Sequence, residues 1–146
     1  MLPQSWPHFT KPCKYLIFKR PMKNFDSWNK LKKGINAKEI TAGIYFRERE
    51  IWFCSLGINI GSEQDGMNKL FERPVLVFKK FTSTVFLAIP LTRSVKQGSW
   101  YFTLNDDSAL VLNQLRVLDA RRLTRKVSTL NESIFQEIRN KLLKVI

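Results

Sequence analysis

In the middle of the chain stand two apolar runs, Arg73-Pro74-Val75-Leu76-Val77-Phe78 and Val85-Phe86-Leu87-Ala88-Ile89-Pro90-Leu91-Thr92. Both runs are rich in β-branched and aromatic residues, and the break between them, residues 79–84, is mostly polar. This pattern is typical of two strands in an antiparallel hairpin. Pairing the strands would bring Arg73, at the entrance of the first, and Thr92, at the exit of the second, to the same end of the sheet.

This pair of side chains has a possible chemical use. A guanidinium beside a hydroxyl is suited to holding a phosphate, because its planar fork donates two parallel hydrogen bonds. The alternative is an ordinary hairpin in which the arginine is only solvated. The spacing of Arg73 and Thr92 does not decide between these two interpretations.

Further short strands and a closing helix are predicted around this hairpin. We expect strands over residues 49–56 and 100–104, one or two within 109–118, and one over 123–127. Apolar residues recur every four positions from Leu130 to Leu142, with Phe135, Leu143 and Val145 widening the stripe, which predicts a C-terminal amphipathic helix. Asn131 can cap its start, or Thr129 in a capping box. Short strands with frequent turns favour a small barrel.

The N-terminal segment has a different texture. Prolines are frequent in residues 1–23 and predict an extended arm. Apolar residues at spacings of three and four predict a helix over residues 25–40, with Asn24 or Asp26 as its cap. The stripe expected to face the core is Phe25, Trp28, Leu31 and Ile35. The lysines expected on the remaining surface are Lys30, Lys32, Lys33 and Lys38.

The net charge of +13 predicts a polyanionic partner. Nucleic acid, an anionic membrane surface and an acidic protein all fit such a charge. Residues 1–42 carry nine of the 25 lysines and arginines but only two of the 12 acidic residues. They could form a solubilising tail, or a basic helix lying against nucleic acid. We divide the chain into a basic arm and helix, residues 1–42, and a β domain, residues 43–146.

Composition also excludes several kinds of site. The single histidine, His8, rules out a two-histidine acid–base nuclease within one chain. Cys13 and Cys54 are two cysteines far apart, so we expect a reduced, cytoplasmic protein with no metal site. No apolar run approaches the length of a membrane helix, and lysines and arginines interrupt the N-terminus, so we expect neither a membrane association nor a signal peptide.

Six features follow one another in order along residues 48–146. They are Arg49-Glu50-Ile51-Trp52, Gly61-Ser62-Glu63-Gln64, Arg73-Pro74-Val75-Leu76-Val77, Ile89-Pro90-Leu91-Thr92, the late segment 111–119 followed by Arg121-Arg122-Leu123, and the closing helix. Together they resemble the toxins of the MazF/PemK (Kid) type of bacterial toxin–antitoxin system. The N-terminal 42 residues have no counterpart in the compact members of that family.

The resemblance implies a mainly β fold, an SH3-like barrel of antiparallel strands with a C-terminal helix, to which this chain adds an N-terminal helix. It implies a homodimer and an antitoxin partner that blocks the substrate groove. It also implies sequence-selective cleavage of single-stranded RNA without metal or other cofactor. The 2′-OH would attack the adjacent phosphorus and leave a 2′,3′-cyclic phosphate and a 5′-OH.

The resemblance also implies roles for individual residues. Arg73 and Thr92 match the family's catalytic arginine and threonine. Glu63 is the only carboxylate in the matching loop and is a candidate base, or else it pairs with Arg49 or Arg73. The residues expected to bind RNA are Ser62, Gln64, Arg93, Ser94, Lys96, Gln114 and Arg116.

The chain departs from the family pattern at four places. The loop over residues 65–72 is longer than usual. Ser62, Asn113 and Val111 occupy positions where some members have histidine, aspartate and arginine. The acid–base set of that branch is therefore absent, and the chain would rely on Arg73 and Thr92.

Two other functions remain open from the sequence. The first is a barrel that binds nucleic acid without cutting it, which the charge favours. The second is a gyrase-directed toxin on the same barrel, because fold does not fix the target. Such relatives depend on C-terminal aromatic contacts, whereas this chain ends in Leu143-Lys144-Val145-Ile146 without a tryptophan.

Overall fold

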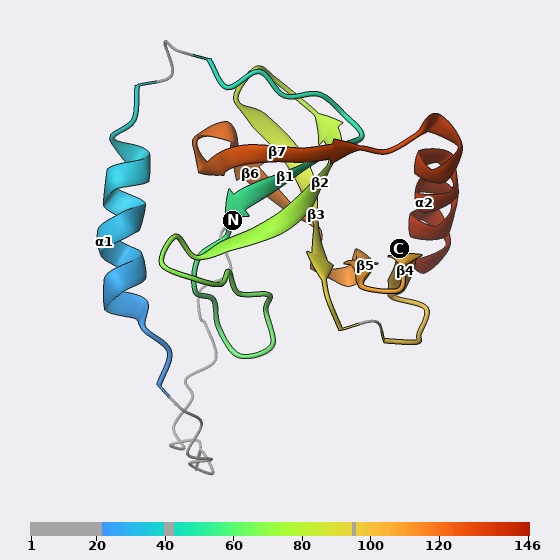
Figure 1. The fold of residues 1–146 in the computed structure, drawn as a ribbon, viewed down its shortest axis with the longest axis horizontal. Coiled ribbons are helices and arrows are strands. Elements are labelled where there is room, and N and C mark those ends of the chain that lie inside the picture. Colours follow the sequence, from blue (N-terminus) through green and yellow to red (C-terminus); the bar gives the residue numbers. More distant parts are fainter. Residues whose placement is uncertain (1–21, 40–42, 95) are drawn as a thin grey trace, which may run out of the picture.

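The computed structural model describes residues 22–39, 43–94 and 96–146 (Figure 1). Within them the order of elements is α1 (Phe25–Asn36), β1 (Glu50–Ser55), β2 (Glu72–Lys80), β3 (Val85–Thr92), β4 (Tyr101–Asn105), β5 (Ser108–Val111), the 3-10 turn η1 (Leu112–Gln114), β6 (Arg116–Asp119), the 3-10 turn η2 (Ala120–Arg122), β7 (Leu123–Thr129) and α2 (Glu132–Val145). The arm predicted over residues 1–23 lies outside the described residues except for its last two positions. His8 and Cys13 lie outside them as well.

Strands β2 and β3 form the antiparallel hairpin that the sequence predicts. In their register, Leu76 of β2 lies opposite Ile89 of β3. The turn between the strands is stabilised by Thr82, whose Oγ1 accepts a hydrogen bond of 3.1 Å from the backbone N–H of Thr84. Strongly β-forming runs on both sides of a hydroxyl-rich turn explain why the sequence alone was sufficient here.

Strand β3 curls the sheet because it pairs with three other strands. It pairs with β2, and it also pairs with β6 through its first residues and with β5 through its last two. Along the sheet the strand order is β4-β5-β3-β2-β1-β7, with β6 beside β3, and all pairs are antiparallel (Figure 1). The predicted mainly β fold with an N-terminal and a C-terminal helix is therefore confirmed. The segment 109–118 contributes two strands, β5 and β6.

The two faces of the β2–β3 hairpin pack against separate apolar layers. Successive side chains of a strand point to opposite faces, so Val75 and Val77 enter one layer and Leu76 enters the other. The inner cluster is Phe46, Cys54, Leu56, Val75, Val77, Phe86, Ala88, Leu118, Ala120 and Leu123. The helix-side cluster is Ile51, Leu76, Ile89, Leu91, Leu110, Leu112, Phe135, Ile138 and Leu142. Burying each large side chain contributes about 1.5–3 kcal/mol, so both layers hold the hairpin in place.

Helix α2 covers the helix-side cluster as predicted. Asn131 is its N-cap, because its side chain accepts a hydrogen bond of 2.9 Å from the N–H of Ile134. Ile138 is fully buried, whereas Leu143, predicted to widen the apolar stripe, is 72% exposed. In the described part of the chain, neither helix has the length and hydropathy that crossing a membrane requires.

Helix α1 lies on the side of the sheet away from α2 (Figure 1). It begins after Asn24, whose side chain accepts from the N–H of Ser27, so the predicted cap is confirmed. Trp28 and Ile35 are buried as expected, but Phe25 is 48% exposed, so the prediction that it faces the core is wrong. The first turn of α1 extends beyond the surface on which the helix packs, and periodicity alone cannot show where that surface ends.

Several element boundaries also differ from prediction, since α1 ends at Asn36 and not near residue 40, and β2 runs from Glu72 to Lys80. Arg49 has a left-handed backbone (φ +73°), so β1 begins one residue later, at Glu50. Trp100 precedes β4 and is 43% exposed. A left-handed backbone at Arg49 and a turn at Trp100 mark strand starts that residue type did not reveal.

Candidate active site

The site begins where β2 enters the sheet and β3 leaves it. Arg73 Nη1 donates a hydrogen bond of 2.9 Å to the backbone carbonyl of Leu91, the residue before Thr92. The guanidinium therefore reaches the segment of β3 that carries the threonine. This end of the hairpin is fixed by further pairing, since Thr92 lies opposite Ala109 of β5.

A second carbonyl fixes the orientation of the Arg73 guanidinium. Its Nε donates a hydrogen bond of 2.6 Å to the backbone carbonyl of Asp65. Burial lowers the pKa of Arg73 from its usual value, while the nearby Asp65 carboxylate opposes this change. A guanidinium has five N–H donors, and these two bonds leave Nη2 and one hydrogen of Nη1 for a ligand. The guanidinium is therefore charged and held in one orientation, and it keeps three N–H donors for a ligand.

Thr92 keeps its own proton available as well. Its Oγ1 accepts a hydrogen bond of 3.3 Å from the backbone N–H of Ser94. Accepting this bond leaves the hydroxyl hydrogen free to donate, because a hydroxyl is both a donor and an acceptor. The side chain is half-buried, beside the exposed Arg93 and Ser94. Lys96, two residues further on, is also exposed.

The loop between β1 and β2 is organised by Asn59. Its backbone N–H donates to Asp65 Oδ1 over 2.6 Å, and its Nδ2 donates to the carbonyl of Gln64 over 2.7 Å. Its Oδ1 accepts from Arg116 Nη1 at 3.4 Å. The backbone and the side chain of Asn59 therefore hold residues 64–65 beside it in the loop, and its side chain also links the loop to β6.

Gln114 of η1 joins the same loop from a distant part of the chain. Its Nε2 donates to the carbonyl of Ser62 over 3.2 Å, and its Oε1 accepts from the N–H of Gln64 over 3.3 Å. Three residues predicted to bind RNA thus meet directly, and Arg116 is attached through Asn59. Gln114 bonds to backbone groups of the loop, so the side chains of Ser62 and Gln64 are not used in these contacts.

Glu63 has a local role in the loop. Its Oε2 accepts a hydrogen bond of 2.8 Å from the N–H of Ile60, and its own N–H donates to the Ile60 carbonyl over 3.0 Å. The carboxylate is exposed. Among the described residues it makes no hydrogen bond or ion pair with Arg49, and none with Arg73. Arg49 pairs instead with Glu132, at 3.1 Å.

The long loop before β2 is a compact turn. Met67 and Glu72 exchange two backbone hydrogen bonds, of 2.7 and 2.8 Å. Gly66 is required inside it, because a Cβ there would lie 1.7 Å from the carbonyl oxygen of Phe71. The extra residues therefore fold back on themselves and leave the carbonyl of Asp65 facing Arg73.

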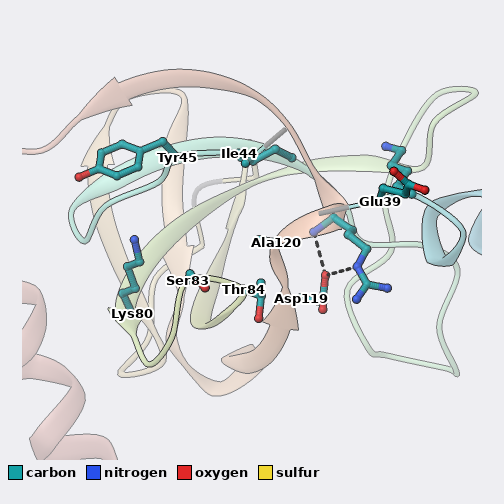
Figure 2. A pocket seen from close by; sticks show the side chains of 11 residues that line it. Glu39, Ile44, Tyr45, Lys80, Ser83, Thr84, Asp119 and Ala120 are labelled. Atoms are coloured by element: carbon teal, nitrogen blue, oxygen red, sulfur yellow. Dashed lines mark hydrogen bonds and ion pairs between the residues drawn. The ribbon is translucent and has the colours of Figure 1, made fainter. Parts of the chain in front are cut away.

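Two other features lie apart from this site. Burial raises the pKa of Cys54 to about 12, so this thiol in the inner cluster is unsuited to act as a nucleophile. A cavity of about 280 Å³ is lined by residues that include Tyr45, Lys80, Thr84 and Asp119 (Figure 2). It lies at the start of β3, up to about 25 Å along the strand from its end at Thr92.

Sequence reasoning missed three residues of the site. Asn59 and Asp65 belong to the loop, and they hold its shape and the Arg73 guanidinium. The third is Lys23, which precedes α1 and forms an ion pair of 2.7 Å with Asp65. Polar residues in a loop carry no periodicity, and no sequence spacing could have related positions 23 and 65.

Comparison with known proteins places this chain in a family. Residues 47–146 match the model of the PemK-like, MazF-like toxins of type II toxin–antitoxin systems. The endoribonuclease MazF of Staphylococcus epidermidis is 30% identical over 111 residues, which cover 66% of this chain and 87% of that protein. The endoribonuclease EndoA of Bacillus subtilis (strain 168) is 28% identical over 102 residues, 61% of this chain and 84% of that protein.

Solved structures agree on the fold. An endoribonuclease in complex with its cognate antitoxin, from a mycobacterial species, has a TM-score of 0.54 at 12% identity, covering 68% of this chain and 93% of that chain. MazF from Deinococcus radiodurans has a TM-score of 0.52 at 21% identity, covering 69% of this chain and 96% of that chain. The family model begins at residue 47 and leaves out the N-terminal segment, so the family domain is the larger, C-terminal part of this chain. The chain therefore belongs to the PemK-like, MazF-like toxins of type II toxin–antitoxin systems, and it carries an N-terminal extension.

Proposed function

We propose that this chain is a toxin endoribonuclease that cleaves single-stranded RNA sequence-selectively and without a metal ion. The observation that carries the proposal is the Arg73 guanidinium, held by two backbone carbonyls beside the segment that bears Thr92. Its relatives from S. epidermidis and B. subtilis are endoribonucleases. The net charge of +13 suits a polyanionic substrate.

RNA supplies its own nucleophile, the 2′-OH, so the enzyme need only align it and stabilise the charge that develops. Arg73 donates to the phosphorane oxygens through Nη2 and the second hydrogen of Nη1. A donor already fixed in this way needs no reorganisation during the reaction, and such donors lower barriers by roughly 3–4 kcal/mol. The products are a 2′,3′-cyclic phosphate and a 5′-OH.

Thr92 and Glu63 complete the proposed catalytic set. The Thr92 hydroxyl donates to the same phosphate or orients the 2′-OH. Glu63 is the candidate general base, and its exposed position in the loop leaves it open to the substrate. For this role its carboxylate must exchange the N–H of Ile60 for the 2′-OH, or use its second oxygen.

The remaining predicted residues form the proposed RNA groove. Ser62, Gln64 and Gln114 lie together in and beside the loop whose Asp65 carbonyl binds Arg73, and their polar side chains can hydrogen-bond unpaired base edges. The residues that would bind the sugar-phosphate backbone are Arg93, Ser94, Lys96 and Arg116. Their guanidinium, ammonium and hydroxyl groups are suited to phosphate oxygens.

We propose a cognate antitoxin protein as the partner that neutralises the toxin by covering this groove. One structural relative is in complex with its cognate antitoxin. A groove lined by arginines and lysines would favour an acidic segment on that partner. We further propose that the toxin is a cytoplasmic homodimer, with residues 43–146 as the toxin domain and residues 1–42 as the extension.

The test is to incubate the full chain with a mixed pool of RNA, with and without excess EDTA, and to sequence the new 5′ ends. We expect cleavage at a short recurring motif in both conditions. Cleavage that disappears with EDTA would rule out the metal-free mechanism. Salt-dependent binding with no cleavage in either condition would identify a binding protein instead.

A further inference from the structure

Lys23, in the described part of the N-terminal extension, contacts the candidate active site. Its Nζ donates to the backbone carbonyl of Asn59 over 2.7 Å and to that of Gly61 over 3.2 Å. It also forms an ion pair of 2.7 Å with Asp65 Oδ2. One side chain from outside the family domain therefore contacts three positions of the loop between β1 and β2, which we call the substrate loop.

These contacts commit the ammonium group to the loop. Two of its three N–H donors bond to loop carbonyls, and the Asp65 carboxylate, 2.7 Å away, balances its charge. Because this charge is already paired inside the protein, the contacts of Lys23 suit it to hold the loop and not the substrate.

Asp65 connects Lys23 to the proposed catalytic arginine. Its Oδ2 faces Lys23, its Oδ1 accepts from the N–H of Asn59, and its backbone carbonyl accepts from Arg73 Nε. A displacement of Asp65 would therefore change the loop and the guanidinium together. Both of these parts must be placed accurately for an in-line attack on phosphorus.

A second contact anchors the extension at the start of the same loop. The ring of Trp28 in α1 lies so close to Gly57 that a Cβ there would be 2.2 Å from its Cε2. The same ring meets Phe71 edge-on, with 5.8 Å between ring centroids. Trp28 is buried, so α1 is packed at this point and presents Lys23 from a fixed base.

We infer that Lys23 is a positioning residue of the active site, through which the N-terminal extension sets the shape of the substrate loop and the orientation of Arg73. This inference rests on the proposed function for its effect on cleavage. Its structural part, that Lys23 orders residues 59–65, stands independently. The extension then forms part of the working site and is not a solubilising tail.

The test compares Lys23→Met, which keeps an unbranched side chain of similar length but removes its donors and charge, with Lys30→Met. Lys30 is exposed on α1, so its substitution removes the same charge without touching the loop. We expect Lys23→Met to lower kcat by roughly ten- to a hundredfold, because small misplacements of reacting groups have effects of that size. The salt dependence of KM should not change. Lys30→Met should keep kcat.

Hydrogen exchange in the free protein separates this inference from the proposed function. In Lys23→Met, the amides of Asn59 and Gln64 should exchange about tenfold faster, because their local opening becomes easier. Wild-type protein that fails to cut RNA would refute the proposed function and leave this measurement valid. Unchanged exchange together with unchanged kcat would overturn the positioning role. A weaker salt dependence of KM in Lys23→Met would overturn it too, because it would assign Lys23 to a phosphate.

Discussion

Arg73 owes its readiness for catalysis to two backbone carbonyls. The carbonyls of Asp65 and Leu91 orient the guanidinium before any substrate arrives. A backbone carbonyl is a more rigid acceptor than a side chain, because it can move only when the loop or β3 itself moves. The Arg73 donors are therefore oriented when the protein folds, and no free energy is needed to reorient them during the reaction.

The charged carboxylate of Glu72 stabilises the folded protein. Glu72 is 3% exposed, and its carboxylate accepts from Thr124 at 2.6 Å and from Asn68 at 3.3 Å and pairs with Arg125 at 3.3 Å. Burial alone would raise its pKa, but these hydrogen bonds and the Arg125 charge outweigh burial, so the pKa of Glu72 is lowered. The ionised carboxylate is therefore part of the folded structure.

We predict that Glu72 contributes to acid stability. Because its folded pKa is lowered, its contribution is present above the unfolded pKa, about 4.3, and is lost as the pH falls through the folded value. Glu72→Gln should lower the free energy of unfolding by about 1–3 kcal/mol at pH 7 and flatten its decline at acid pH. Urea unfolding across pH checks this, with the exposed Glu137→Gln as control. Equal acid declines in wild type and Glu72→Gln would contradict it.

Among the elements, the β2–β3 hairpin was the easiest to predict and α1 was harder. The hairpin is a local structure, so its periodicity and its turn residues determine it. The exposure of Phe25 at the start of α1 depends on how far the underlying surface extends, which is a property of the whole fold. The contact between Trp28 and Gly57 could not be predicted either, because in the sequence Gly57 is an ordinary loop glycine.

We predict opposite effects for two glycine substitutions. Gly57 has a left-handed backbone (φ +89°) and Trp28 against it, so Gly57→Ala should destabilise the protein by about 1–3 kcal/mol. Gly34, within α1, has no atom within 4 Å of a new Cβ, so Gly34→Ala should stabilise by about 0.5–1 kcal/mol. Thermal unfolding of both variants tests this. A neutral Gly57→Ala would contradict the close packing of α1.

At the scale of the whole molecule, the sequence predicted more of the framework than of the site. The antiparallel sheet, its capping helix and the end of β3 that carries Thr92 follow from local patterns and from the family resemblance. The loop geometry does not, because it depends on contacts such as those of Gln114 and Lys23 with residues far along the chain. Single polar side chains that bind distant carbonyls leave no periodic signal.

The net charge makes a prediction for the molecule as a whole. If the three proposed cations Arg93, Lys96 and Arg116 each neutralise one phosphate, log Kd for single-stranded RNA should rise with log salt with a slope of about 2. Binding to 2′-O-methyl RNA, which lacks the nucleophile, measures it without cleavage. Lys96→Ala should reduce the slope by about 0.7, while Lys144→Ala, on the exposed side of α2, should not change it. A slope near zero would contradict an electrostatic groove.

The central claim is that Arg73 stabilises the transition state of metal-free RNA cleavage. The most direct measurement compares wild type, Arg73→Ala and the exposed Arg139→Ala in EDTA, by the rate of cleavage of one RNA and the chemistry of its new 3′ ends. We predict 2′,3′-cyclic phosphate ends, a rate for Arg73→Ala lower by roughly 10²–10³ with the fold retained, and an unchanged rate for Arg139→Ala. Cleavage by Arg73→Ala at the wild-type rate would contradict the account.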